Sequence, residues 1–210
     1  MYTTYLFDFD YTLADAGEGI VLCFHLTFDA LGHKRASDEE IRKTIGWTLG
    51  EAYTHLTGIT DHERILQFRK IYRAFADVHM TEHTQLLPET IPVLTELKRR
   101  GKKLGVVTTK YRYRICEAVE KFSLHGLFDC IVGGEDVSAA KPDPEGLNLI
   151  CEKLGVKKSE VLYIGDCDVD AIAAERAGID FAGVTTGTTT HEEFAQYPHR
   201  KIMSNLTELL

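Results

Sequence analysis

The stretch YLFDFDYTLAD, residues 5–15, decides how we interpret the chain. It begins as an apolar run typical of a buried strand and then places two carboxylates, Asp8 and Asp10, one residue apart. Ionised carboxylates resist burial unless another group pairs with them. Open α/β sheets bind ligands at the carboxyl ends of their parallel strands. We therefore expect Asp8, Asp10 and the following Thr12 to lie in an active site.

The composition limits the kinds of partner. The chain has 210 residues and a formal net charge of −8, which argues against a nucleic-acid backbone as ligand. A small anionic substrate remains possible because it responds to local charge. The five cysteines form no CxxC pair, which is typical of a reducing compartment. With no signal-peptide or membrane-spanning pattern, we expect a cytoplasmic protein without a membrane partner, either a monomer or a homodimer.

Residues 16–83 carry helical patterns. Apolar residues recur at helical spacing over residues 18–31. Ser37 and Thr60 are each followed three residues later by Glu, and these two capping boxes predict helix starts. The second box opens a long amphipathic helix that runs to about residue 78. Because no convincing strand interrupts it, we expect this block to be an α-helical domain.

From residue 88 onward, strands alternate with helices. The expected strands are 104–108, 130–132, 161–164, 181–184 and 201–203, and the helices between them include 89–100, 115–122 and 147–154. Such alternation predicts a parallel sheet with right-handed crossovers. The fold class is therefore α/β: a Rossmann-like parallel-sheet core of residues 1–15 and 84–210, with an inserted α-helical cap domain of residues 16–83. Since the insertion begins beside the Asp8 stretch, we expect the cap to act as a lid.

Polar clusters follow four of these strands and should meet on one rim of the sheet. They are Asp8/Asp10/Thr12, then Thr108-Thr109-Lys110, then Lys141, then Asp166/Asp168/Asp170. Carboxylates are the oxygen ligands that Mg²⁺ prefers. Hydroxyls, helix-start amides and an ammonium group suit phosphate oxygens. The combination predicts phosphoryl chemistry at a magnesium site.

The motifs DxDxT, a Thr after an apolar strand, a Lys before Pro, and GDxxxD, in this order, resemble the haloacid dehalogenase superfamily. The chain looks most like its phosphoglycolate-phosphatase branch, which carries a helical cap. The resemblance implies a Mg²⁺-dependent phosphatase acting on a small phosphorylated metabolite, phosphoglycolate-like or a sugar phosphate. It implies that Asp8 is the nucleophile, which becomes an aspartyl-phosphate, and that Asp10 is the general acid and base.

The remaining site residues follow from the same resemblance. Thr108 and Lys141 hold the transferring phosphoryl group. The metal ligands are Asp8, Asp166 and the backbone carbonyl of Asp10, with Asp170 as a further ligand or as an anchor behind them. The substrate-facing positions are Tyr11, Thr12, Thr109 and Lys110.

Three positions depart from the family pattern. Tyr11 replaces the usual Gly, Thr109 the usual Asn, and Cys167 a frequent Ser. None removes a catalytic group. We hypothesise that the Tyr11 ring narrows the entrance below the cap and favours small substrates.

Several alternatives stay open at this point. A phosphosugar mutase of the β-phosphoglucomutase type, a pyrophosphatase and a nucleotidase share these motifs. A dehalogenase is disfavoured because it lacks the carboxylate at Asp10, and a phosphate-binding module needs no acid there. HMTEH at residues 79–83 fits a zinc-protease pattern that short motifs often match by chance. Arg112 and Arg114, near a helix start, are either anion ligands or solvated side chains.

Overall fold

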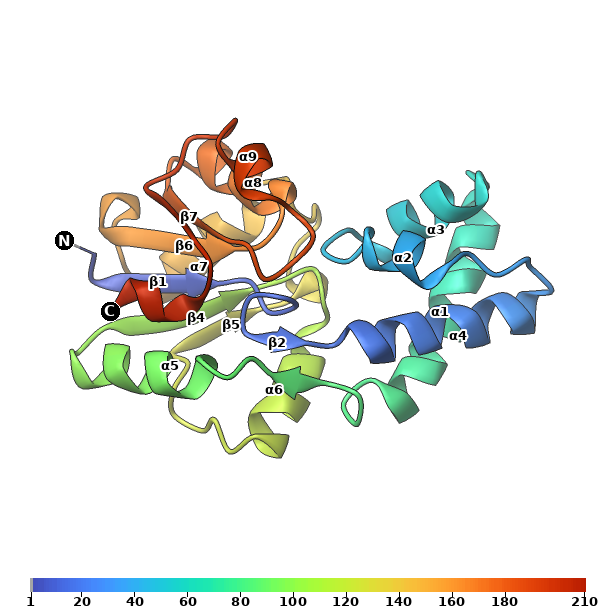
Figure 1. Cartoon of the computed structure of the whole chain (residues 1–210), viewed down its shortest axis with the longest axis horizontal. Coiled ribbons are helices and arrows are strands. Elements are labelled where there is room, and N and C mark those ends of the chain that lie inside the picture. Colours follow the sequence, from blue (N-terminus) through green and yellow to red (C-terminus); the bar gives the residue numbers. More distant parts are fainter. Residues whose placement is uncertain (1) are drawn as a thin grey trace. The chain divides into compact units, whose positions relative to one another are not determined.

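The computed structural model describes residues 2–210 and divides into two compact units (Figure 1). One contains the described residues up to Ala14 together with Leu86–Leu210, and the other is Asp15–Gln85. The connecting segments, β2 (Ala14–Asp15) and β3 (Gln85–Leu86), form a two-stranded sheet. The lid role of residues 16–83 stays a prediction.

The first unit contains a six-stranded sheet in the order β5-β4-β1-β6-β7-β8, in which every neighbouring pair is parallel. The strands are β1 (Thr4–Phe7), β4 (Lys103–Val107), β5 (Cys130–Val132), β6 (Val161–Gly165), β7 (Asp180–Val184) and β8 (Lys201–Met203). This corresponds to the Rossmann order 3-2-1-4-5-6, whose direction reverses between β1 and β6. The predicted α/β fold class is confirmed. Strand β4 ends one residue earlier than predicted, so Thr108 lies in the loop beyond it.

Helices cover both faces of the sheet. One face packs against α5 (Thr90–Arg99), α6 (Arg112–Lys121) and the 3₁₀ helix η3 (Leu206–Leu209). The other packs against α7 (Glu145–Leu154), α8 (Asp168–Ala177) and α9 (His191–Phe194). Two further 3₁₀ helices are η1 (Gly134–Asp136) and η2 (Lys158–Glu160). Side chains alternate between these layers as the strand period requires, with Phe7 on the first face and Leu6 on the second.

The second unit consists of helices α1 (Gly17–Leu31), α2 (Asp38–Arg42), α3 (Leu49–Thr57) and α4 (His62–His79). Aromatic rings fill its interior, and Phe68 stacks on Tyr53 with ring centroids 4.4 Å apart. No helix among residues 2–210 has the length and hydropathy needed to cross a bilayer.

The N-cap residues of the helices in the second unit agree only in part with those predicted from the sequence. The predicted box at Ser37 is present. At α4 the prediction was wrong by one residue, because the Asp61 carboxylate accepts from the Arg64 amide at 3.0 Å and makes Asp61 the N-cap in place of Thr60. A further box, Thr48 with Glu51, opens α3 and was not predicted.

Candidate active site

The site is built on the carboxyl ends of the central strands. Phe7 pairs with Val106 of β4 and with Ile164 of β6, so the three strands end almost level. Asp8, Thr108 and Asp166 therefore emerge on the same rim, and all three are buried. The sheet direction reverses here, which is where open α/β sheets bind ligands.

Lys141 is the centre of a buried charge cluster. Its Nζ lies 3.0 Å from Oδ1 of Asp8 and 2.6 Å from Oδ1 of Asp170, and the three side chains are at most 4% exposed. Burial opposes the ammonium charge, but the carboxylates of Asp170 and Asp8 outweigh it and raise the pKa of Lys141 well above its usual value. Lys141 is therefore a permanent cation at neutral pH.

Both carboxylate oxygens of Asp170 are already bonded. Oδ1 accepts from Lys141 and from the Tyr163 hydroxyl, at 2.6 and 2.8 Å. Oδ2 accepts from the Cys167 thiol at 3.0 Å and from its amide at 3.3 Å. This arrangement suits an anchor for Lys141 better than a metal ligand.

Lys141 is the single cation paired with the buried carboxylates of Asp8 and Asp170, and Asp166 lies beside them. Burial is the largest cause that raises the pKa of Asp8 to about 6, even though Lys141 acts in the opposite direction. Burial, then Asp170 and Asp8, raise the pKa of Asp166 well above its usual range. In the described part of the chain, Asp8 Oδ1 and Asp10 Oδ1 are buried without a hydrogen bond, although the first has Lys141 beside it. Asp8 and Asp166 would be stabilised in their ionised form by a further positive charge, and an all-oxygen donor set fits Mg²⁺.

The other predicted residues join this rim in pairs. Lys110 Nζ lies 2.9 Å from Asp10 Oδ2, and both side chains are 12% exposed. The Thr12 hydroxyl donates to Asp166 Oδ1 at 3.1 Å. The Thr108 hydroxyl accepts from the Lys110 amide at 3.2 Å, which ties the β4 loop together.

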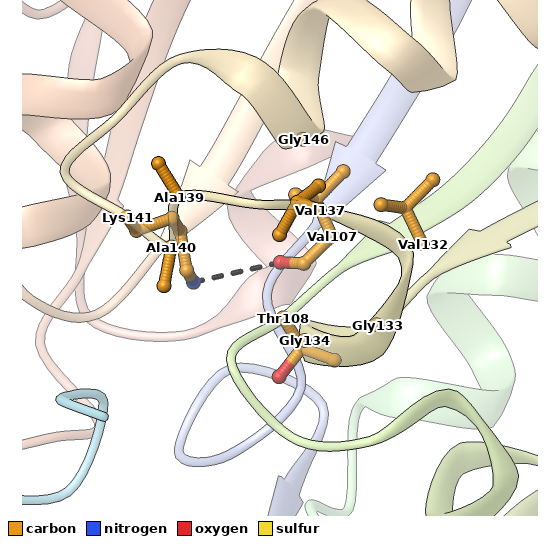
Figure 2. Close-up of a pocket in the computed structure, with 10 residues that line it drawn as sticks. All are labelled: Val107, Thr108, Val132, Gly133, Gly134, Val137, Ala139, Ala140, Lys141 and Gly146. Carbon is orange, nitrogen blue, oxygen red and sulfur yellow. Dashed lines mark hydrogen bonds between the residues drawn. The ribbon is translucent and has the colours of Figure 1, made fainter. Parts of the chain in front are cut away.

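Figure 2 shows the wall formed by Thr108 and Lys141 with the loops beyond β4 and β5. Lys141 reaches toward the Val107 carbonyl oxygen, 3.5 Å from its Nζ. The cavity between them has a volume of about 10 Å³ and is lined mainly by valine, alanine and glycine residues. That volume holds about one water molecule.

Tyr11 lies in a tight loop between Asp10 and Thr12. Its φ of 56° is in the left-handed region, which explains why the family pattern has Gly here. The backbone is held by the Tyr11 amide, which donates to Ala14, and by its carbonyl, which accepts from the Thr186 hydroxyl. The side chain is buried.

Tyr11→Gly is expected to lower the free energy of unfolding by about 2–3 kcal/mol, because the loss of a buried ring outweighs the relief of about 1 kcal/mol of backbone strain. Ser123 also has a φ of 56° but is exposed, so Ser123→Gly provides the matched backbone control and should gain about 0–1 kcal/mol. Urea denaturation measures both variants. A Tyr11→Gly enzyme as stable as the Ser123→Gly enzyme would show that the ring contributes no packing. If the ring restricts the entrance, Tyr11→Gly should also gain activity on bulkier phosphate esters.

Some contributing residues were not predicted. Gly187 approaches so closely that a Cβ there would lie 2.0 Å from Asp166 Oδ2. Glu135 accepts from the Arg112 amide at 2.7 Å, and Gly134 packs on the carbonyl of Thr109. Tyr163 contacts both Lys141 and Asp170. The glycines in the GGED and TTGT stretches were a usable signal, whereas Tyr163 lies in an apolar run like any core aromatic.

Other sequence candidates lie outside this cluster. Arg112 pairs with Asp136 at 3.2 Å, but its side chain is 52% exposed and therefore solvated, whereas Arg114 is buried and pairs with Glu117 at 2.9 Å. Among residues 2–210, one group of acidic, His or Cys side chains has its ligand atoms within 4.8 Å of one another, and it is Asp166, Cys167 and Asp170. The HMTEH stretch contributes no residue to this group.

Comparisons with known proteins identify the family of the chain. A family model described as haloacid dehalogenase-like hydrolase matches residues 5–184. Pyrophosphatase PpaX of Bacillus velezensis is 31% identical over 99% of this chain and 94% of its own length. Phosphoglycolate phosphatase of Photorhabdus laumondii is 29% identical over 97% of this chain and 89% of its own length.

Two solved structures have closely similar folds. A haloacid dehalogenase-like hydrolase from Bacteroides fragilis has a TM-score of 0.98 and 48% identity, with both chains covered in full. A protein from Clostridium acetobutylicum, described as a predicted phosphatase, has a TM-score of 0.92 and 25% identity and covers 100% of this chain and 96% of its own.

Proposed function

Because the chain belongs to the haloacid dehalogenase-like hydrolases and is a phosphatase of that family, we propose that it releases phosphate from a small phosphorylated metabolite through a phosphorylated Asp8. The observation that carries this proposal is the position of Asp8, a buried carboxylate 3.0 Å from a permanent ammonium group. A carboxylate attacks a phosphate dianion only where positive charge offsets the repulsion.

The chain's residues divide the remaining work. Asp8 attacks phosphorus, and Asp10, two residues away, gives a proton to the leaving oxygen. Asp10 later takes a proton from the water that hydrolyses the aspartyl-phosphate. Thr108 and Lys141 bind the equatorial oxygens of the transferring group.

The same geometry supports a Mg²⁺ requirement. We infer that Asp8 and Asp166 hold the ion, together with the Asp10 carbonyl, and that Asp170 positions Lys141. When bound, Mg²⁺ supplies positive charge that offsets the charge of the phosphoryl oxygens. Thr12 and Gly187 both act on Asp166, the proposed metal ligand. The Thr12 hydroxyl orients the Asp166 carboxylate, and Gly187 has no side chain to crowd the second oxygen of Asp166.

Mg²⁺ should raise the melting temperature more at pH 7.5 than at pH 5. The folded pKa of Asp8, about 6, and that of Asp166 are above their unfolded values near 4. The folded state therefore binds protons more tightly, and the metal-free protein loses stability as pH rises from about 4 through these values. Mg²⁺ removes that penalty where the carboxyls are ionised. Differential scanning fluorimetry with EDTA or Mg²⁺ measures the effect, and an equal shift at both pH values would contradict the site.

The substrate class is narrowed by Lys110. Its ammonium lies 2.9 Å from Asp10, the group that protonates the leaving oxygen. A leaving group with its own anionic end would meet Lys110 there, which favours phosphoglycolate and, as a second candidate, pyrophosphate. The second candidate is supported by the pyrophosphatase name of relatives at about 30% identity.

A screen of phosphate release tests the proposal. Phosphoglycolate, pyrophosphate, sugar phosphates and nucleotides are compared by kcat/KM at saturating Mg²⁺. We expect the best substrate to have an anionic leaving group, and Lys110→Met to reduce that preference. Conversion of a sugar phosphate to its isomer without free phosphate would instead identify a mutase.

A further inference from the structure

Tyr163 is a buried tyrosine on β6 whose hydroxyl lies inside the Lys141 cluster. The residue is fully buried, and its ring packs on the face of the sheet that α7 and α8 cover. A buried tyrosine hydroxyl normally finds one hydrogen-bond partner. Here it has three, and two of them are charged groups of the site.

The three contacts fit the donors and acceptors available. Lys141 Nζ donates to the hydroxyl oxygen at 3.1 Å. The single hydroxyl proton has two acceptors, Asp170 Oδ1 at 2.8 Å and the Val107 carbonyl at 3.1 Å. Lys141 has three N–H donors and four oxygen atoms around them: Asp170 Oδ1 at 2.6 Å, Asp8 Oδ1 at 3.0 Å, the Tyr163 hydroxyl at 3.1 Å and, farther away, the Val107 carbonyl at 3.5 Å.

The contacts join segments that are distant in sequence. Val107 is the last residue of β4, directly before Thr108, whereas Asp170 lies in the first turn of α8. Without the hydroxyl, the only uncharged oxygen among these four would be the Val107 carbonyl, 3.5 Å from Lys141 Nζ, and Asp170 is already the closer carboxylate. The neutral hydroxyl is the nearer uncharged partner and adds no charge, so the ammonium stays shared between Asp8 and Asp170.

We propose that Tyr163 is a positioning residue, whose hydroxyl fixes the direction in which Lys141 presents its ammonium to Asp8 and to the transferring phosphoryl group. This inference rests on the phosphatase function proposed above. Two of the three hydroxyl contacts are to Lys141 and Asp170 and the third is to the carbonyl directly before Thr108, so Tyr163 acts through Lys141 and Asp170. A residue that only fills space would need the ring and not the hydroxyl.

Tyr163→Phe keeps the ring and removes the hydroxyl. We expect kcat to fall about 10- to 100-fold, the range typical of a hydrogen bond to a charged group, with KM changed less than threefold. The matched control is Tyr2→Phe, because the Tyr2 hydroxyl also donates to a carboxylate, Asp180, at 2.7 Å, but at the opposite ends of the strands. Activity is expressed per folded molecule, determined by near-ultraviolet circular dichroism.

Two inhibitors separate positioning from simple binding. Orthovanadate mimics the five-coordinate transition state, whereas inorganic phosphate resembles the ground state. In Tyr163→Phe, the inhibition constant for vanadate should rise by about the factor by which kcat/KM falls, while that for phosphate changes less than threefold. Equal weakening of both inhibitors, or a kcat within threefold of wild type, overturns the proposal.

A double variant tests the route through Asp170. In an Asp170→Asn background, Tyr163→Phe should lower kcat by a much smaller factor than it does in the wild type, since both changes disrupt the same hydrogen-bond network. If the fold-changes in kcat of the two single variants simply multiply in the double variant, the inference is overturned. If Tyr163→Phe folds poorly, the second measurement is NMR of the Lys141 ammonium protons in the wild-type enzyme. The absence of a cross-peak between these protons and the Tyr163 ring overturns the proposal. A wild-type enzyme that hydrolyses no phosphate ester would instead refute the function itself.

Discussion

Asp8→Asn is expected to lower kcat by about 10⁴-fold or more, the size of effect seen when a nucleophile is removed. The carboxamide that replaces the carboxylate is a weak nucleophile and carries no negative charge. It has nearly the same volume, so Lys141 keeps Asp170 as a partner at 2.6 Å. The loss should therefore appear in turnover and not in folding.

The stability of this variant is a separate test of the same cluster. Burial raises the pKa of Asp8 to about 6, so its ionised form is destabilised at neutral pH in the metal-free protein. Removing that charge should leave the melting temperature in EDTA equal or higher. Asp180→Asn is the control, because Asp180 begins β7 at the opposite edge and bonds Tyr2 and Arg200. It should retain full activity.

Acid trapping during steady state identifies the covalent step and should show a phosphorylated peptide containing residue 8. In ¹⁸O-water, attack of water on the carbonyl carbon of the aspartyl-phosphate places ¹⁸O in the Asp8 carboxyl. Attack on phosphorus places ¹⁸O in the released phosphate, as direct hydrolysis of the substrate also does, so in that case the trapped peptide is the evidence for the intermediate. Full activity of Asp8→Asn, or a phosphorylated peptide elsewhere in the chain, would contradict the mechanism.

The sheet and its rim were predictable because both depend on local patterns. Apolar runs such as 161–164, bounded by Gly and charged residues, specify a strand and its end. Once the strands are parallel, Asp8, Thr108 and Asp166 must emerge on the same edge. The pairing register that makes these strand ends level is a property of the folded sheet, and the structure shows it directly.

Contacts between segments that are distant along the chain could not be predicted from the sequence. Nothing in the pattern around Tyr163 distinguishes a core ring from one whose hydroxyl bonds Lys141, 22 residues away. The pairing of Lys110 with Asp10 spans two strands that only the fold brings together. The choice between neighbouring capping residues was also missed, as at α4, where Asp61 is the N-cap beside Thr60, which is also a capping residue type.

Lys141→Met is expected to lower the free energy of unfolding by about 3–5 kcal/mol, as when one partner of a buried ion pair is removed. Methionine fills a similar volume but leaves Asp8 and Asp170 buried without their shared cation. Activity should also be lost, since no other described ammonium group lies against Asp8. Urea denaturation in EDTA measures the stability.

The pH dependence identifies the cause. In Lys141→Met the folded pKa of Asp8 rises further above its unfolded value near 4, because the Lys141 charge that lowers it is gone, so the folded state binds protons more tightly at mildly acidic pH. The free energy of unfolding of Lys141→Met should therefore be only slightly below that of the wild type near pH 5 and furthest below it at pH 8. A packing defect would give the same deficit at both pH values.

A surface pair and a second substitution complete the test. Lys98 pairs with Asp129 at 2.9 Å with its side chain 27% exposed, so Lys98→Met should cost less than about 1 kcal/mol. Adding Asp170→Asn to Lys141→Met removes one of the two unpaired charges and should recover at least about 1 kcal/mol. The double variant should nevertheless remain inactive, because stability depends on the balance of charge in the cluster, whereas catalysis requires an ammonium group beside Asp8. If the double variant were no more stable than Lys141→Met, the cluster would not be held together by its charges.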